Sequence, residues 1–154
     1  MKILISSCLL GKNVKYSGGN NLSERLVALF KKYNVKLIEV CPEVLGGLSI
    51  PREASEISNG EVITKSGLWV SNEFKKGAET ILKIALKNNI DFAVLKERSP
   101  SCGRKFIYDG TFSGKLIKGQ GLSTQKLLEN GIEVFSEENF EEIEEKLKEF
   151  YKIL

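Results

Sequence analysis

Short, mainly apolar runs alternate along this chain with longer segments in which apolar residues recur every three or four positions. The runs lie at residues 3–5, 35–40, 91–95 and 132–135. The first run, Ile3 to Ile5, is uninterrupted, which is typical of a central strand buried on both faces of a parallel sheet. The alternation predicts an α/β fold: a three-layer sandwich with a mostly parallel, Rossmann-like sheet.

Helices are predicted between these runs, at residues 22–33, 72–88 and 123–130 and from Phe140 to Phe150. The pattern is clearest in residues 72–88, where apolar side chains recur at the spacing of one helix face. We expect Asn21 to cap the first of these helices and Gly131 to end the third.

A small antiparallel excursion is predicted between the second and third strands. Asn59-Gly60 lies between short β-prone segments, and a second turn is expected near residues 65–67. Asn-Gly flanked by such segments is a strong signal for a two-residue hairpin turn. We therefore expect a β-hairpin on the rim of the sheet, and a further short strand or turn at residues 106–108.

The composition limits the classes of protein that this chain can belong to. Its 154 residues are expected to form a single domain over positions 1–154. The net charge is only +3, which by itself argues for neither a nucleic acid nor a membrane partner. No apolar run approaches the ~20 residues that span a bilayer. The first run is followed by Gly11-Lys12-Asn13 without a cleavage site, so we interpret it as a strand of a cytoplasmic protein and not as a signal peptide.

Each of the three cysteines follows a predicted strand. Cys8 and Cys41 come directly after the first two strands, and Cys102 follows the third by a short loop. The carboxyl ends of parallel strands meet at one edge of a sheet, and this edge is where α/β proteins bind ligands. We therefore expect the thiols to share one crevice, with sulfurs roughly 6–7 Å apart if they surround a cubane-type cluster, given metal–sulfur bonds of ~2.3 Å.

Three thiolates at one place form a set of metal ligands. An iron–sulfur cluster held in this way would have one iron without a protein ligand. Zinc bound by three cysteines and a carboxylate is the alternative, and three small buried apolar side chains are the plainest interpretation. The chain has no histidine, which excludes Cys–His and Ser–His catalytic pairs. It also has no Cys-x-x-Cys motif, which argues against a thiol-redox protein.

Polar residues close to these cysteines are candidates for the chemistry. Glu43, two residues after Cys41, is a candidate for proton transfer. Ser99 and Ser101 precede Cys102, and such serines bond either to the backbone or to a substrate or cluster sulfide. Arg52 and Glu56 are expected either to form an ion pair or to bind substrate.

Several motifs together are similar to those of the DUF523 family, which includes the bacterial thiouracil desulfidases. The resemblance runs from residue 3 to about residue 137, nearly the whole chain. It rests on these segments: Ser6-Ser7-Cys8-Leu9-Leu10-Gly11, Cys41-Pro42-Glu43 with Gly46-Gly47-Leu48, Pro51-Arg52, Ser99-Pro100-Ser101-Cys102-Gly103 and Tyr108-Asp109-Gly110-Thr111-Phe112.

The resemblance implies a [4Fe–4S] cluster held by Cys8, Cys41 and Cys102, whose fourth iron takes the sulfur of a thiolated pyrimidine. It also implies that Glu43 and Ser99 are the catalytic glutamate and serine, with Ser101 as the alternative serine. The implied enzyme is a desulfidase that replaces C=S by C=O in a 2-thiouracil-like compound and releases sulfide, with water deprotonated by Glu43.

Three points stay open at the level of the sequence. The substrate is a small thiolated pyrimidine, a thiolated nucleoside or a tRNA. A non-catalytic iron–sulfur or zinc-binding module, acting as a sensor or sulfur carrier, is the alternative to an enzyme. The chain also departs from the family pattern at Lys15-Tyr16-Ser17-Gly18, where Arg-Tyr-Asp-Gly is usual, at Val14, where cysteine is frequent, and at Trp69-Val70-Ser71, where Asp-Val-Thr is common.

Overall fold

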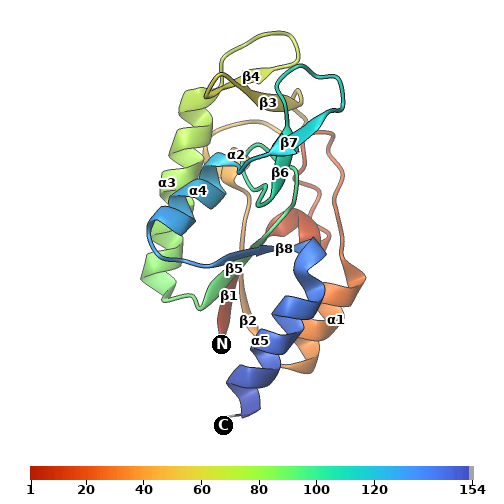
Figure 1. Ribbon diagram of the computed structural model, residues 1–154, viewed down its shortest axis with the longest axis vertical. Coiled ribbons are helices and arrows are strands. Elements are labelled where there is room, and N and C mark those ends of the chain that lie inside the picture. Colours follow the sequence, from red (N-terminus) through yellow and green to blue (C-terminus); the bar gives the residue numbers. More distant parts are fainter. Residues whose placement is uncertain (153–154) are drawn as a thin grey trace.

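A four-stranded parallel sheet forms the centre of the molecule (Figure 1). The computed structural model describes residues 1–152. The strand order is β2–β1–β5–β8, and all three neighbouring pairs are parallel. The strands are β1 (Lys2–Ser6), β2 (Lys36–Val40), β5 (Phe92–Leu95) and β8 (Val134–Ser136). The predicted parallel sheet is confirmed, although β8 begins two residues later than the sequence predicts.

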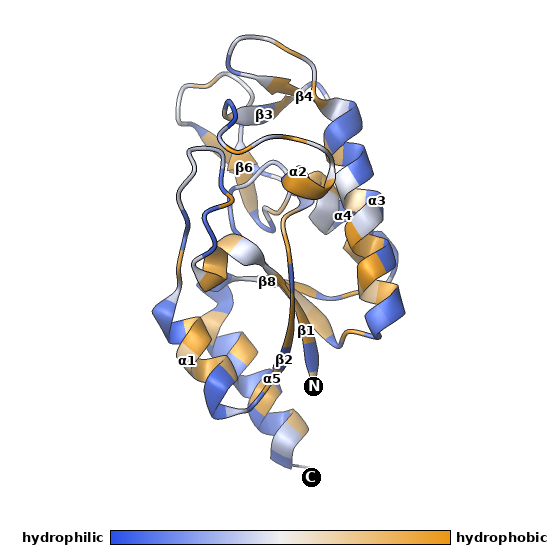
Figure 2. Cartoon of the chain, turned by 180° about the vertical axis from the view of Figure 1, so that it is seen from behind, coloured by the Kyte–Doolittle hydropathy of each residue, from blue (hydrophilic) through white to orange (hydrophobic). Residues whose placement is uncertain are grey.

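Helices cover both faces of the sheet and complete the three layers. α1 (Glu24–Lys32) and α5 (Phe140–Lys152) pack on one face, against Ile3 and Ile5 of β1. α3 (Ser71–Asn88) and α4 (Leu122–Glu129) pack on the other, against Leu4. Successive side chains of a strand point to opposite faces, so three consecutive apolar residues in β1 serve two separate cores. Figure 2 shows the apolar sides of α1 and α3 turned inward and their charged sides turned outward.

The order of the strands defines where a ligand site can form. From β1 the chain passes to β2 on one side and later returns to β5 on the other side of β1. The connections therefore diverge at β1, which leaves a crevice beyond the carboxyl ends of β1 and β5. Cys8 and Cys102 follow these two strands, and Cys41 follows β2.

Short elements gather beyond this edge of the sheet (Figure 1). The 3₁₀ helix η1 (Ser7–Leu10) follows β1, and the one-turn helix α2 (Pro42–Leu45) follows β2. Two hairpins lie farther out: β3 (Ser55–Ser58) with β4 (Glu61–Thr64), and β6 (Phe106–Tyr108) with β7 (Leu116–Lys118). A second 3₁₀ helix, η2 (Glu137–Asn139), leads into α5. No helix in residues 1–152 is long and apolar enough to cross a membrane.

Of two local predictions, the hairpin turn at Asn59-Gly60 and the helix cap at Asn21, the structure confirms the first and contradicts the second. Asn59 and Gly60 have φ values of 51° and 78°, the positive values that a two-residue hairpin turn of this type requires, so the predicted turn is confirmed. The predicted cap is wrong: Ser23 takes the N-cap position of α1, without a side-chain bond, and the helix begins at Glu24. Asn21 lies instead in the wall of the cavity described below, because the segment before α1 folds back over the end of β1.

Candidate iron–sulfur site

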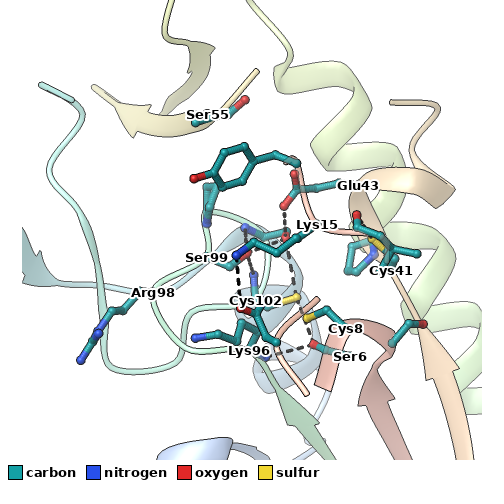
Figure 3. Close-up of a pocket in the computed structure, with 18 of the residues that line it drawn as sticks. Ser6, Cys8, Lys15, Cys41, Glu43, Ser55, Lys96, Arg98, Ser99 and Cys102 are labelled. Atoms are coloured by element: carbon teal, nitrogen blue, oxygen red, sulfur yellow. Dashed lines mark hydrogen bonds between the residues drawn. The ribbon is translucent and has the colours of Figure 1, made fainter. Parts of the chain in front are cut away.

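One cavity of about 420 Å³ lies beyond the carboxyl ends of the strands and is lined by all three cysteines (Figure 3). Cys8 lies in η1, Cys41 is the N-cap residue of α2, and Cys102 lies in the loop after β5. Cys8 packs with the core under α1 and α5, whereas Cys102 packs with the core under α3 and α4. The thiols therefore reach the cavity from the two sides of the sheet edge, as their positions after the strands predict.

The thiols have different hydrogen-bonding environments. The Cys102 sulfur is buried and lies 3.6 Å from the hydroxyl oxygens of both Ser6 and Ser101, and Ser6 donates to it. The Cys41 thiol is half-buried and donates to the carbonyl oxygen of Val14 at 3.9 Å. Ser6 thus contributes to the site from the last position of β1. The sequence analysis did not predict this role, although a polar residue at the end of an apolar run was a signal for it.

Burial raises the pKa of all three thiols above the ordinary value. The pKa of Cys102 rises to about 12, because burial outweighs the bonds from Ser101 and Ser6. Burial also raises the pKa of Cys8, opposed by a bond from Asn21. Thiols of this kind are poor nucleophiles as they stand. A bound metal deprotonates its thiol ligands, so these residues suit metal binding better than thiol chemistry.

The arrangement of the thiols distinguishes between two kinds of metal site. Within residues 1–152, no three side chains of Cys, Asp or Glu lie close enough together to hold a single metal ion. The three thiols instead line the wall of one cavity. A cluster is held by thiolates that bind different irons and that lie farther apart than the ligands of one zinc ion. The donor set therefore fits a cluster better than a zinc ion.

Glu43 lies between a guanidinium group and a serine hydroxyl. Arg52 Nε donates to Glu43 Oε1 at 3.0 Å, and Ser101 Oγ donates to Glu43 Oε2 at 2.8 Å. The Arg52 side chain is only 7% exposed, and its two remaining nitrogens donate to the carbonyl oxygens of Ser49 and Val14. The ion pair considered between Arg52 and Glu56 does not form, because the loop after α2 returns Arg52 to Glu43.

The two serines of the Cys102 loop have different roles in the hydrogen-bonding network. Ser99 Oγ accepts from the backbone N–H groups of Ser101 and Cys102, both at 3.1 Å. Because the Ser101 hydroxyl donates to Glu43, the Ser99 hydroxyl is left to donate to Ser101 Oγ, 2.8 Å away. Ser101 is 2% exposed, whereas Ser99 is half-buried at the cavity wall. Ser101 therefore links Ser99 to the carboxylate.

The loop that carries these serines is built around Glu97. Its Oε1 accepts four backbone N–H groups, those of Arg98, Arg104, Lys105 and Phe106. Burial alone would raise the pKa of this carboxyl, but the four N–H groups outweigh burial and lower it. The sequence analysis missed Glu97, since an acceptor for backbone groups has no sequence signature beyond its place after a buried strand.

Lys96 is a further cavity residue that the sequence analysis missed. Its ammonium group forms an ion pair with Glu137 at 2.7 Å and donates to the carbonyl oxygen of Glu97. Its charge also acts on Cys8, whose pKa it lowers against the larger effect of burial. Lys96 thus brings a positive charge to the wall that holds the thiols.

Fold and site together define a class: an α/β protein with three thiols around a cavity at the point where its strand connections diverge. The chain belongs to the 2-thiouracil desulfurase family, whose family model matches residues 3–139. The resemblance stated from the motifs is confirmed by this match.

Two relatives cover nearly the whole chain. The protein YbbK of Bacillus subtilis (strain 168) is 40% identical in an alignment 151 residues long, which covers 92% of this chain and 99% of YbbK. The solved structure of the [4Fe-4S]-dependent thiouracil desulfidase TudS (DUF523Vcz) is 42% identical, with a TM-score of 0.84 and 99% of each chain covered. Identity at this level over the full length also confirms the fold class.

Proposed function

We propose that this protein is an iron–sulfur-dependent desulfidase that replaces the sulfur of a thiolated pyrimidine by oxygen. The observation that carries the proposal is the convergence of Cys8, Cys41 and Cys102 on one cavity, in a chain 42% identical to a [4Fe-4S]-dependent thiouracil desulfidase. These three cysteines would hold a [4Fe–4S] cluster. We expect their sulfurs about 6–7 Å apart in the loaded protein, given metal–sulfur bonds of ~2.3 Å.

The cluster, when bound, supplies an iron without a protein ligand, a Lewis acid for the sulfur of the substrate. The chain supplies hydrogen bonds to the cluster ligands. The Ser6 hydroxyl donates to the Cys102 sulfur and stabilises its anionic form, and Ser101 Oγ lies at the same distance from this sulfur. The Lys96 ammonium group adds a positive charge to the same wall.

Glu43 is the residue that we propose to accept a proton from the attacking water. Arg52 fixes one of its oxygens and Ser101 the other, so the carboxylate is held in one orientation. Ser99 is at the other end of the hydrogen-bonded chain, in the cavity wall, where its hydroxyl would turn from Ser101 Oγ to donate to the substrate or the water. Water and the thiocarbonyl compound give the carbonyl compound and hydrogen sulfide; no electrons are gained or lost, so no redox partner is needed.

Anaerobic reconstitution with iron and sulfide, followed by incubation with 2-thiouracil, tests this proposal. We expect sulfide and uracil in equal amounts. Serine in place of Cys8, Cys41 or Cys102 should abolish the cluster absorbance and the activity together. A protein that loads its cluster but releases no sulfide from any thiolated pyrimidine would contradict the enzyme and point to a non-catalytic module.

The variants Glu43→Gln, Ser99→Ala and Ser101→Ala test the assigned roles. We expect Glu43→Gln to keep the cluster and to lower turnover by about 10²–10⁴-fold, the usual range for loss of a general base. Ser99→Ala should lower turnover, and Ser101→Ala should also alter the cluster spectrum, because Ser101 contacts Cys102. Ser58→Ala, a serine of β3 outside the cavity wall, is the matched control. Full turnover by Glu43→Gln would remove Glu43 from the mechanism.

Three finer points belong to the same proposal. We infer that the substrate is a small thiolated pyrimidine, and thiolated nucleosides and tRNA are to be assayed beside the free base. We infer that the whole chain is one domain, since Ser55 and Tyr108 from the two hairpins line the same cavity as the cysteines. We expect the protein to act in the cytoplasm, where thiols stay reduced.

A further inference from the structure

Glu56 is a buried carboxylate in the wall of the cavity that the proposed reaction does not use. It lies on β3 and is 9% exposed. Its Oε1 accepts the backbone N–H groups of Gly110 at 3.0 Å and Phe112 at 3.1 Å. No donor among residues 1–152 reaches its Oε2, and this oxygen is not among the fully buried atoms that lack a partner, so it stays accessible.

Four basic side chains line the cavity, and none of them bonds to Glu56: Lys15 donates to Asn21, and Arg98 pairs with Glu138. The Arg52 guanidinium bonds to Glu43, and the Lys96 ammonium group bonds to Glu137. No ion pair to Glu56 forms in the described part of the chain. Removing a carboxylate from bulk water costs free energy unless other hydrogen-bond donors replace the water. Glu56 therefore has one oxygen anchored by the protein and one to which no group of residues 1–152 donates.

Glu97, the other buried carboxylate of this wall, is used differently. All four groups bonded to its Oε1 come from residues 98–106, so its carboxyl group lies within the loop that it anchors. Glu56 instead reaches from β3 to a separate segment, the turn after β6. Two backbone donors hold Glu56 in a fixed position from one side, while its second oxygen is not fully buried.

We propose that Glu56 Oε2 accepts a ring N–H of the substrate and so selects heterocycles that carry such a group. The inference rests on the proposed function, because a thiolated pyrimidine with a free ring nitrogen presents an N–H beside its thiocarbonyl group. A hydrogen bond to a carboxylate is stronger than one between neutral groups. A site built for a substrate N–H rejects analogues that lack it, because its acceptor is then left without a partner.

Binding of uracil tests the role of Glu56 without requiring turnover, because uracil keeps both ring N–H groups and has no sulfur. The cluster-loaded protein is dialysed to equilibrium against radiolabelled uracil, 1-methyluracil or 3-methyluracil. We expect wild-type protein to bind uracil at least tenfold more tightly than one of the two methylated compounds. This comparison uses no variant, so it does not depend on how a substitution affects folding.

Glu56→Gln separates recognition from structure. Its amide oxygen can still accept from Gly110 and Phe112, while the accessible oxygen becomes a donor. We expect its affinity for uracil to fall at least tenfold and its discrimination between the methylated compounds to shrink, with the melting temperature unchanged. Glu53→Gln is the matched control: Glu53 accepts from Ser66 N and Oγ and lies outside the cavity wall. Its affinity for uracil should equal that of the wild type.

The outcomes separate this inference from the proposed function. Equal uracil binding by wild type and Glu56→Gln, or equal binding of uracil and both methylated compounds by the wild type, would overturn the role of Glu56. Sulfide release from 2-thiouracil would then still support the desulfidase. Conversely, binding that depends on Glu56 without any sulfide release would support Glu56 as a recognition residue and contradict the desulfidase.

Discussion

The helix that carries Glu43 rests directly on the backbone of α3, and this contact leads to a sharp prediction for Gly77→Ala. A Cβ atom added to Gly77 would lie 2.8 Å from the carbonyl carbon of Pro42, and closer still to its oxygen. Ordinary contacts begin at 3.4 Å, so relieving the contact with the carbon alone would need a movement of 0.6 Å, and relieving the closer contact with the oxygen would need a larger one. The atoms in the way belong to the backbone and cannot rotate aside.

Two opposing effects set the magnitude. Forcing an extra methyl group into a packed interior costs about 1–3 kcal/mol. Alanine is the better helix former and returns up to about 1 kcal/mol. We therefore expect the free energy of unfolding to fall by about 1–2 kcal/mol. α2 also carries Glu43 and directly follows Cys41. We therefore expect turnover of the folded, cluster-loaded protein to fall as well, since a misplacement of ~1 Å in a reacting geometry can lower a rate by about 100-fold.

Urea unfolding of the cluster-free protein and sulfide release by the loaded protein measure the two effects separately. Gly19→Ala is the control, since the same added methyl group would meet its nearest atom, Ser17 Oγ, at an ordinary 3.5 Å. If Gly77→Ala were as stable as wild type and equally active, α2 would be free to shift. The close contact with α3 would then not position Glu43.

Three further substitutions have defined expectations. Arg52→Ala leaves the Glu43 carboxylate without its cation, and urea unfolding should show a loss of about 3–5 kcal/mol, whereas Arg52→Lys should lose less. Glu97 has a lowered pKa in the fold, so the stability that it adds is present at neutral pH and is lost as the pH falls below about 4.5 and through the lowered value. The stability difference between wild type and Glu97→Gln should therefore shrink in acid, and a constant difference from neutral pH downward would contradict this. Ser6→Ala removes one donor to Cys102 and the acceptor for Lys96 N, and should cost about 1–3 kcal/mol in the same unfolding assay, without loss of the cluster.

The parallel sheet and the meeting of the cysteines were predictable because both depend on burial and topology. Residues 3–5 are apolar without interruption because β1 is covered on both faces, and no exposed strand needs that pattern. Once parallel strands share a sheet, residues that directly follow them must lie at one edge. Cys8 and Cys41 could therefore be placed together directly, and the loop before Cys102 is short enough to keep this thiol at the same edge.

The short elements of the cavity wall were not predictable, since each is too brief to show a period. α2 has four residues and β7 has three. The partner of Arg52 was also beyond the sequence: Glu56 is nearer along the chain, but the loop between α2 and Arg52 brings the guanidinium back to Glu43. Only the path of that loop in space decides between the two carboxylates.

Polar contacts, more than apolar packing, hold the chemical groups of this site in place. The carbonyl oxygen of Val14 accepts from both Cys41 and Arg52, and Arg52 in turn holds Glu43. Glu43 is joined through Ser101 to the loop of the third cysteine. Each of these groups is a donor or acceptor for the next, so the loss of one leaves its neighbour buried without a partner, at a cost that exceeds the lost bond itself. Substitutions in this network should therefore lower turnover, and those that remove a contact to a cysteine should also alter the cluster. A change at Glu56, whose side chain bonds to the turn after β6, should affect substrate binding alone.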